Sequence, residues 1–176
     1  MNKDLLKIRK VNSKDAKEWF QLVNKVWRDA YKNIFPEEVF IEKENQVHER
    51  VKTFNKKINN SNKSIAYVAE YDGNIIGIMC GNINSLYEYF KADYADLKAI
   101  YIDPKFQRLG IGSAFKDIFE KWAKENGATK YVIGVLKDNI KARKVYELWG
   151  GRLSEYENNY SKLDIEYPEV FYIFDL

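Results

Sequence analysis

Two glycines, Gly110 and Gly112, stand between a predicted strand and a predicted helix in the middle of this 176-residue chain. The strand pattern ends at Pro104, because proline cannot donate to a strand ladder. From residue 111 onward, apolar residues recur with the spacing of one helix face. The first N–H groups of a helix have no partner within the helix, and glycine lets a bulky anion approach the backbone closely. The segment 107–112, QRLGIG, therefore predicts a cradle for a diphosphate.

This segment lacks the motifs of two common classes of diphosphate-binding site. The chain contains no P-loop string, and a dinucleotide fingerprint would need a third glycine where Phe115 stands. The segment resembles the Q/R-x-x-G-x-G/A signature of the GCN5-related N-acetyltransferases (the GNAT family), whose loop holds the pyrophosphate of acetyl-CoA. Gln107, Gly110 and Gly112 fall on its three defined positions. For this motif alone, a loop with glycine at a helix start is the alternative.

A second motif runs from Asn139 to Gly150 and resembles the GNAT pattern N-x-x-A-x-x-x-Y-E-x-x-G. Asn139 and Tyr146 are seven residues apart, so a helix brings both side chains to nearly the same face. In the family, the asparagine bonds the pantetheine arm and the tyrosine faces the cofactor sulfur. Taken alone, the two residues could equally be a helix N-cap and a core side chain. Gly151 stands where the family usually has phenylalanine, which we expect to alter local packing only.

The resemblance implies that this enzyme moves an acetyl group from acetyl-CoA to a primary amine by direct attack on the thioester. It implies that Tyr146 is a general acid toward the CoA thiolate, because a phenol with a pKa of about 10 is protonated at neutral pH. Some family members carry a base at the position of Asp96; a surface aspartate at a strand end is the alternative. The implied coenzyme-binding residues are Ile100, Tyr101, Ile102, Gln107, Arg108, Leu109, Gly110, Ile111, Gly112, Ser113, Asn139 and Tyr146.

Aromatic and acidic residues alternate in the segments where the family builds its acceptor pocket. Such side chains suit a cation, which motivates the hypothesis that the acceptor is a polyamine or another small cationic amine. The string IYI-x-x-x-F-Q-x-x-G-x-G also resembles bacterial polyamine-acetylating members. Packing in the core or at a dimer face is the alternative. The residues are Trp27, Tyr31, Phe35, Tyr87, Glu88, Tyr89, Phe90, Asp93 and Tyr94.

Two functions of other classes remain open from the sequence. One is a non-catalytic acyl-CoA-binding sensor or interaction domain on the same fold, against which the presence of Tyr146 argues. The other is a module that binds a different nucleotide through QRLGIG, against which the missing third glycine argues. Both alternatives would bind a diphosphate without transferring an acetyl group.

The elements around these motifs predict the order β-α-α-β-β-β-α-β-α-β-β. This order is that of the GNAT fold: an α/β protein with a mixed, mostly antiparallel sheet of six to seven strands and helices on both faces. We expect a single N-acetyltransferase domain over residues 1–176. The predicted elements that matter below are helices at 16–34 and from Pro36 to about 59, a hairpin of strands 64–71 and 74–82 around Asp72–Gly73, and final strands at 152–156 and 169–174.

Composition excludes several classes of protein. The net charge of +3 is spread over 29 basic and 26 acidic residues, so no nucleic-acid partner is expected. Cys80 is the only cysteine, which excludes an intrachain disulfide and a zinc cluster, and we expect no metal. No apolar run reaches the roughly 18 residues of a membrane span, and the start of the chain lacks a signal core. We therefore expect a cytoplasmic protein without a membrane partner; the aromatic C-terminal strand could serve a homodimer interface.

Overall fold

The computed structural model describes residues 5–58, 63–90 and 94–176. Contacts between Cα atoms divide the chain into two compact units. Unit 1 comprises residues 1–81 and 99–119, and unit 2 comprises residues 82–98 and 120–176. The single domain expected over residues 1–176 stays a prediction.

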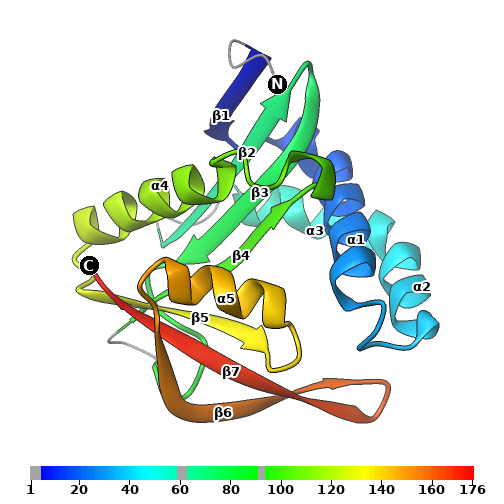
Figure 1. Ribbon diagram of the computed structural model, residues 1–176. Coiled ribbons are helices and arrows are strands. Elements are labelled where there is room, and N and C mark those ends of the chain that lie inside the picture. Colours follow the sequence, from blue (N-terminus) through cyan, green and yellow to red (C-terminus); the bar gives the residue numbers. More distant parts are fainter. Residues whose placement is uncertain (1–4, 59–62, 91–93) are drawn as a thin grey trace. The chain divides into compact units, whose positions relative to one another are not determined.

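The described residues form a seven-stranded sheet with the strand order β1-β2-β3-β4-β5-β7-β6. Strands β4 and β5 run parallel, whereas the pairs β1–β2, β5–β7 and β6–β7 are antiparallel. This arrangement confirms the predicted α/β fold class. Figure 1 shows the elements, which are β1 (Leu6–Lys10), α1 (Ala16–Tyr31), α2 (Glu37–Asn45), α3 (Val47–Ile58), β2 (Ser64–Tyr71), β3 (Asn74–Asn82), β4 (Ala95–Ile102), α4 (Ile111–Glu125), β5 (Lys130–Leu136), α5 (Ile140–Leu148), β6 (Arg152–Lys162) and β7 (Ile165–Asp175).

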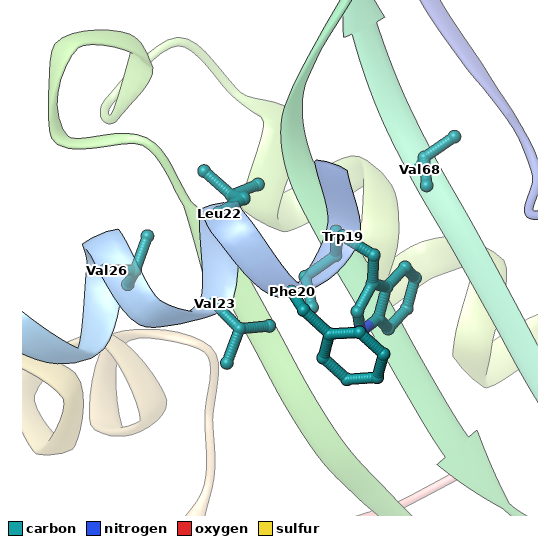
Figure 2. Close-up of a cluster of buried hydrophobic side chains, with 7 residues drawn as sticks. Trp19, Phe20, Leu22, Val23, Val26 and Val68 are labelled. Atoms are coloured by element: carbon teal, nitrogen blue, oxygen red, sulfur yellow. The ribbon is translucent and has the colours of Figure 1, made fainter. Parts of the chain in front are cut away.

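In unit 1, helices pack on both faces of the strands. Helix α1 repeats apolar residues with the spacing of one helix face, so they bury one stripe. That stripe, together with Val68 of β2 and Ile78 of β3, forms the cluster in Figure 2. On the other face of β3, Gly77 lies against Ile111 and Phe115 of α4, where a Cβ on the glycine would be 3.1 Å from the Phe115 ring. The α1 residues of the cluster are Trp19, Phe20, Leu22, Val23 and Val26.

The hairpin around Asp72–Gly73 forms as predicted. Asp72 and Gly73 have φ angles of 50° and 76°, so both adopt the left-handed conformation that a two-residue hairpin turn requires. The side chain of Asn74 donates to the Asp72 carbonyl over 2.9 Å and supports the turn. The strands on either side, β2 and β3, have the predicted bounds.

The prediction of one helix from Pro36 to about residue 59 is wrong, because the chain forms two helices, α2 and α3, separated at Gln46. The Gln46 N–H still bonds the Glu42 carbonyl over 3.1 Å, and the Gln46 carbonyl accepts from the Arg50 N–H over 3.0 Å. The break carries no proline or glycine, so helical periodicity could not reveal it. The predicted turn at residues 59–62 lies outside the described residues.

The final strands are longer than predicted. Strands β6 and β7 form the extended orange and red hairpin of Figure 1 instead of the short segments 152–156 and 169–174. Leu163 and Asp164 make its turn, with φ angles of 51° and 60°. Polar residues occupy both faces of this part of the hairpin, so the apolar alternation that signals a strand is absent. The turn also lacks the asparagine or glycine that favours left-handed backbone.

Candidate functional site

The predicted anion-binding loop in unit 1 is an open backbone cradle. Gln107 ties the loop to the end of β4, since its side-chain Nε2 donates to the Ile102 carbonyl over 3.2 Å. The Gly110 carbonyl accepts from the Ala114 N–H over 3.0 Å, which places Gly110 at the start of α4. Arg108 and Gly110 have φ angles of 61° and 84°. No atom lies within 4 Å of where a Cβ on Gly110 would stand.

The side chains of this loop have different environments. Gln107, Arg108, Leu109, Gly110 and Ser113 are exposed, and Gly112 is half-buried. Ile111 is 2% exposed, because its side chain packs in the core of unit 1. Of Ile111, only the backbone N–H can therefore serve an anion. The predicted strand residues of β4, namely Ile100, Tyr101 and Ile102, are half-buried.

Asp103 fixes the end of β4 just before this loop, which sequence reasoning missed. Its Oδ2 accepts from the Lys25 ammonium over 2.5 Å, and its Oδ1 accepts from the Lys105 N–H over 3.0 Å. Its own N–H donates to the Ile76 carbonyl over 2.9 Å. Burial raises the pKa of Asp103, but the hydrogen bonds from Lys25 and Lys105 outweigh it and hold the pKa below its ordinary value.

Asp96, the predicted base, is a buried side chain of unit 2. It pairs with Val132 in the register between β4 and β5 and is only 2% exposed, so the alternative of a surface aspartate is wrong. Within the described residues its Oδ1 has no hydrogen-bond partner. Burial raises the pKa of Asp96 to about 6, against smaller opposing effects of Lys98 and a backbone hydrogen bond at Leu86.

A second buried carboxylate, Glu169, belongs to the same environment and was not predicted. Its Oε1 accepts from the Tyr87 hydroxyl over 3.0 Å, and its Oε2 accepts from Asn158 Nδ2 over 3.4 Å. Burial raises the pKa of Glu169, and its negative charge in turn raises the pKa of Asp96. The only sequence signal was one charged residue at the start of the apolar run EVFYIF.

Gly134 makes room for the Tyr87–Glu169 bond. A Cβ on Gly134 would overlap the Tyr87 hydroxyl and would lie 2.8 Å from Glu169 Oε1. Burial, followed by the charge of Glu169, raises the pKa of Tyr87 above its ordinary value, so this phenol stays protonated and donates to Glu169. Gly134 therefore allows two polar side chains to meet against the backbone of β5.

We expect Gly134→Ala to lower the free energy of unfolding by about 1–3 kcal/mol, because the added methyl group must displace Tyr87 or Glu169. Urea denaturation of the variant and the wild type measures the difference. Combining the change with Tyr87→Phe removes the overlapping hydroxyl and should restore part of the loss. A Gly134→Ala variant as stable as the wild type would contradict the close packing.

Strand alternation places two sets of side chains on opposite faces of unit 2. Asp96 pairs with Val132, and Phe171 pairs with Gly134. Val132 and Gly134 are two positions apart on β5, so they and their partners lie on one face. Glu169 is two positions before Phe171 on β7 and lies on that face as well. Tyr87 packs on that same face in a cluster with Phe90, Val132 and Phe171. Tyr172 is the next residue after Phe171 and faces the other side.

Tyr146, the predicted acid, lies against the opposite face. Its half-buried ring contacts Tyr172, with ring centroids 5.8 Å apart. The Tyr172 hydroxyl donates to Glu147 over 2.7 Å and accepts from Arg143 Nε over 3.2 Å, which fastens α5 to β7. Tyr146 is the smallest of the contributions that raise the pKa of Tyr87.

Asn139 is the N-cap of α5, which was the alternative to a role in coenzyme binding. Its Oδ1 accepts from the Ala142 N–H over 3.2 Å. The cap uses only the oxygen, so Nδ2 can donate to a bound ligand. At the other end of α5, a Cβ on Gly151 would be 2.5 Å from the Phe174 ring. Phe174 thus fills the space beside the glycine, which accounts for the small residue there.

The aromatic residues predicted to bind a cation divide between core and surface. Tyr31, Phe35 and Phe90 are buried, so the packing alternative holds for them. Trp27 stacks on Phe35, with ring centroids 5.7 Å apart. Tyr89 is exposed and stacks on Tyr156, with ring centroids 4.4 Å apart. Asp93 lies outside the described residues.

Neither a membrane span nor a metal cluster is found in the described part of the chain. None of its helices is long and apolar enough to cross a membrane. Among the residues that the structure describes, no group of three or more His, Cys, Asp or Glu side chains could hold a metal ion.

Comparison with family models identifies one family, and comparison with solved structures identifies the fold. Residues 19–150 match the model of the acetyltransferase (GNAT) family. The PaiA N-acetyltransferase of Thermoplasma acidophilum, solved with coenzyme A, shares 18% identity and a TM-score of 0.74, over 97% of this chain and 99% of that one. An N-acetyltransferase of Staphylococcus aureus Mu50 shares 22% identity and a TM-score of 0.69, over 97% and 98%.

A third structure holds the acetylated coenzyme. YncA of Salmonella typhimurium, solved with acetyl-CoA, shares 14% identity and a TM-score of 0.63, over 97% of this chain and 94% of that one. A search of the curated proteins found no match. At these identities the solved structures establish the fold, and the family model covers most of the chain.

Proposed function

Because this chain belongs to the GNAT family of acetyltransferases, we propose that it transfers an acetyl group from acetyl-CoA to a primary amine of a small cationic acceptor. The observation that carries the proposal is the burial of Asp96 with one carboxylate oxygen unpartnered among the described residues. A buried carboxylate with an unpartnered oxygen is unfavourable for folding alone, so a role in proton transfer or cation binding accounts for it.

The backbone of unit 1 fits the diphosphate of acetyl-CoA. The left-handed Gly110 leaves open space where a side chain would stand, and the first N–H groups of α4 follow it directly. These groups favour a bound anion through their unpaired hydrogens and the helix dipole. In unit 1, the proposal assigns the diphosphate to residues 107–113 and the pantetheine to the backbone of Ile100–Ile102. In unit 2, Asn139 Nδ2 is the donor that the family resemblance implies for the pantetheine arm. Bound acetyl-CoA supplies an acetyl group activated as a thioester.

Asp96 serves as the base in this proposal. An alkylammonium with a pKa of about 10.4 is almost entirely protonated at neutral pH, so the acceptor must lose a proton before its nitrogen can attack. Asp96 Oδ1 takes that proton. A pKa of about 6 leaves the Asp96 carboxylate mostly ionised at neutral pH, yet makes it a stronger base than an exposed aspartate.

Tyr146 serves as the acid on the other face of the sheet. The thiolate has a pKa of about 8.5 and the phenol about 10, so the proton transfer to sulfur is uphill by only about 2 kcal/mol. From acceptor ammonium to amide, the nitrogen loses two protons. Asp96 takes the first and releases it to solvent. The second leaves to solvent as the C–S bond breaks, and solvent returns a proton to Tyr146 after its phenol has protonated the sulfur. The opposite faces of Asp96 and Tyr146 suit an amine that arrives on one side and a thiol that departs on the other.

The acceptor in this proposal is a polyamine or a similar small amine. Its support is the buried acidic face of unit 2, where the half-buried ring of Tyr87 lies beside Glu169 and Asp96 is on the same face. Aromatic faces and carboxylates both favour an alkylammonium ion over a neutral ligand.

We expect acetyl-CoA-dependent thiol release with polyamines at a rate well above that with amino acids, aminoglycosides or N-terminal peptides. A thiol-reactive dye follows the release, and mass spectrometry identifies the acetylated product. Tight acetyl-CoA binding without release for any amine would instead favour the non-catalytic sensor. If spermidine and spermine react no faster than a simple primary amine, the polyamine part of the proposal fails.

A further inference from the structure

We propose that Glu169, held by Tyr87, is a binding subsite for a second positive charge on the acceptor, separate from the amine that Asp96 deprotonates. This inference rests on the proposed function and adds a specificity-determining residue to it. It predicts that the preferred acceptor is a dication, with the reacting nitrogen at Asp96 and another ammonium at Glu169.

The geometry around Glu169 indicates a fixed anionic site. Glu169 is 9% exposed, and the Tyr87 and Asn158 side chains each donate to a different oxygen of its carboxylate. Both donors are neutral, so they orient the carboxylate without cancelling its charge. In the part of the chain that the structure describes, neither Glu169 nor Asp96 forms an ion pair with a basic side chain within 4 Å.

The unpartnered oxygen of Asp96 is the independent sign of a ligand. Asp96 is 2% exposed, and its Oδ1 has no hydrogen-bond partner among the described residues. It lies on the same face of the sheet as Glu169, by the strand registers described above. Two buried like charges repel each other, and a bound cation relieves both the repulsion and the missing hydrogen bond.

Charge balance favours two ammonium groups over one. When the acceptor arrives, one ammonium gives its proton to Asp96, so nitrogen and carboxylate both become neutral. Glu169 does not take part in that transfer and keeps its negative charge. A second ammonium neutralises Glu169, whereas a monoamine leaves a buried charge without a partner, which is costly. The half-buried ring of Tyr87 provides apolar surface for the methylene chain between the two nitrogens.

The test compares a series of α,ω-diamines with the monoamines of equal length, in which a methyl group replaces the second ammonium. Steady-state kinetics give kcat/KM for each pair. For the best diamine, we expect the wild type to prefer it over its monoamine by about ten- to hundredfold, the range for a charge-assisted hydrogen bond. In Glu169→Gln this ratio should fall to about one, mainly through a higher KM for the diamine.

Two further variants control the interpretation. Glu166→Gln removes an exposed carboxylate of the same strand and should keep the wild-type ratio. Tyr87→Phe keeps the charge of Glu169 but removes its hydrogen bond, and should give an intermediate ratio. Thermal unfolding checks that each variant is folded, and if Glu169→Gln does not fold, the ratio in Tyr87→Phe decides. A wild type without a diamine preference, or an unchanged ratio in a folded Glu169→Gln, would overturn the subsite.

Calorimetry separates this inference from the proposed function. If no amine is acetylated, the proposed function fails, but the binding of a diamine and of its matched monoamine can still be measured in the presence of CoA. Tighter diamine binding in the wild type and equal binding in Glu169→Gln would support the subsite. Equal binding of both amines to the wild type would overturn it.

Discussion

Asp96→Asn is expected to lower kcat/KM for the amine about 10²–10⁴-fold at pH 7.5, the usual range for the loss of a general base. Asparagine keeps the size of the side chain and can still accept the backbone hydrogen bond at Leu86, but it cannot take a proton. Steady-state thiol-release kinetics on the best acceptor measure the loss. Asp117→Asn, which changes an exposed aspartate on α4, is the matched control.

The pH dependence of kcat/KM in the wild type and in Asp96→Asn tests whether Asp96 is the base. An ionised carboxylate is required to accept the proton, so wild-type kcat/KM should fall about tenfold per pH unit below the raised pKa of Asp96, about 6. The Asp96→Asn variant should lack this acidic limb, because asparagine does not titrate. A variant that retains the wild-type rate would remove Asp96 from the chemistry.

Tyr146→Phe is expected to lower kcat about 100-fold or more, with little change in the Kd for acetyl-CoA. The ring still packs on Tyr172 and Trp149, so α5 should keep its place, while the proton donor is lost. Stopped-flow thiol release gives the rate, and calorimetry gives the affinity for acetyl-CoA. Tyr156→Phe, which changes an exposed tyrosine of β6, is the matched control.

An acetyl donor with a more acidic thiol distinguishes proton donation from a merely structural role. A thiolate of low pKa departs without a proton, so the gap between wild type and Tyr146→Phe should narrow with such a donor. If the gap stays the same for both donors, or if the variant turns over at the wild-type rate, Tyr146 is not the acid.

Local sequence patterns predicted the loop and the capped helix well. Gln107, Gly110 and Asn139 contact backbone groups within about five residues of themselves, so spacing along the chain was enough to place the loop and the helix start. Their roles in binding the coenzyme stay predictions. The hairpin at Asp72–Gly73 is equally local, because two left-handed residues define it. The break at Gln46 escaped prediction, since no residue type marks it.

Long-range pairing explains what the sequence could not show. Glu169 and Tyr87 are 82 positions apart, and only the register of β7 with β5 brings the carboxylate beside Gly134. Asp96 is likewise buried where β4 pairs with β5, at Val132, a residue of the cluster that contains Phe90. Asp96 was predicted as a base by its position in a family pattern, while its environment required the fold.

The unpartnered oxygen of Asp96 has a consequence for selection experiments. Because the pKa is raised from 3.8 to about 6, the folded chain keeps a proton that the unfolded chain has already released in that pH window. The ionised carboxylate therefore destabilises the fold progressively as pH rises through this window, and fully above it. Directed evolution for heat resistance at neutral pH should replace Asp96 early and yield robust, inactive proteins. A library of this kind needs a simultaneous screen for turnover.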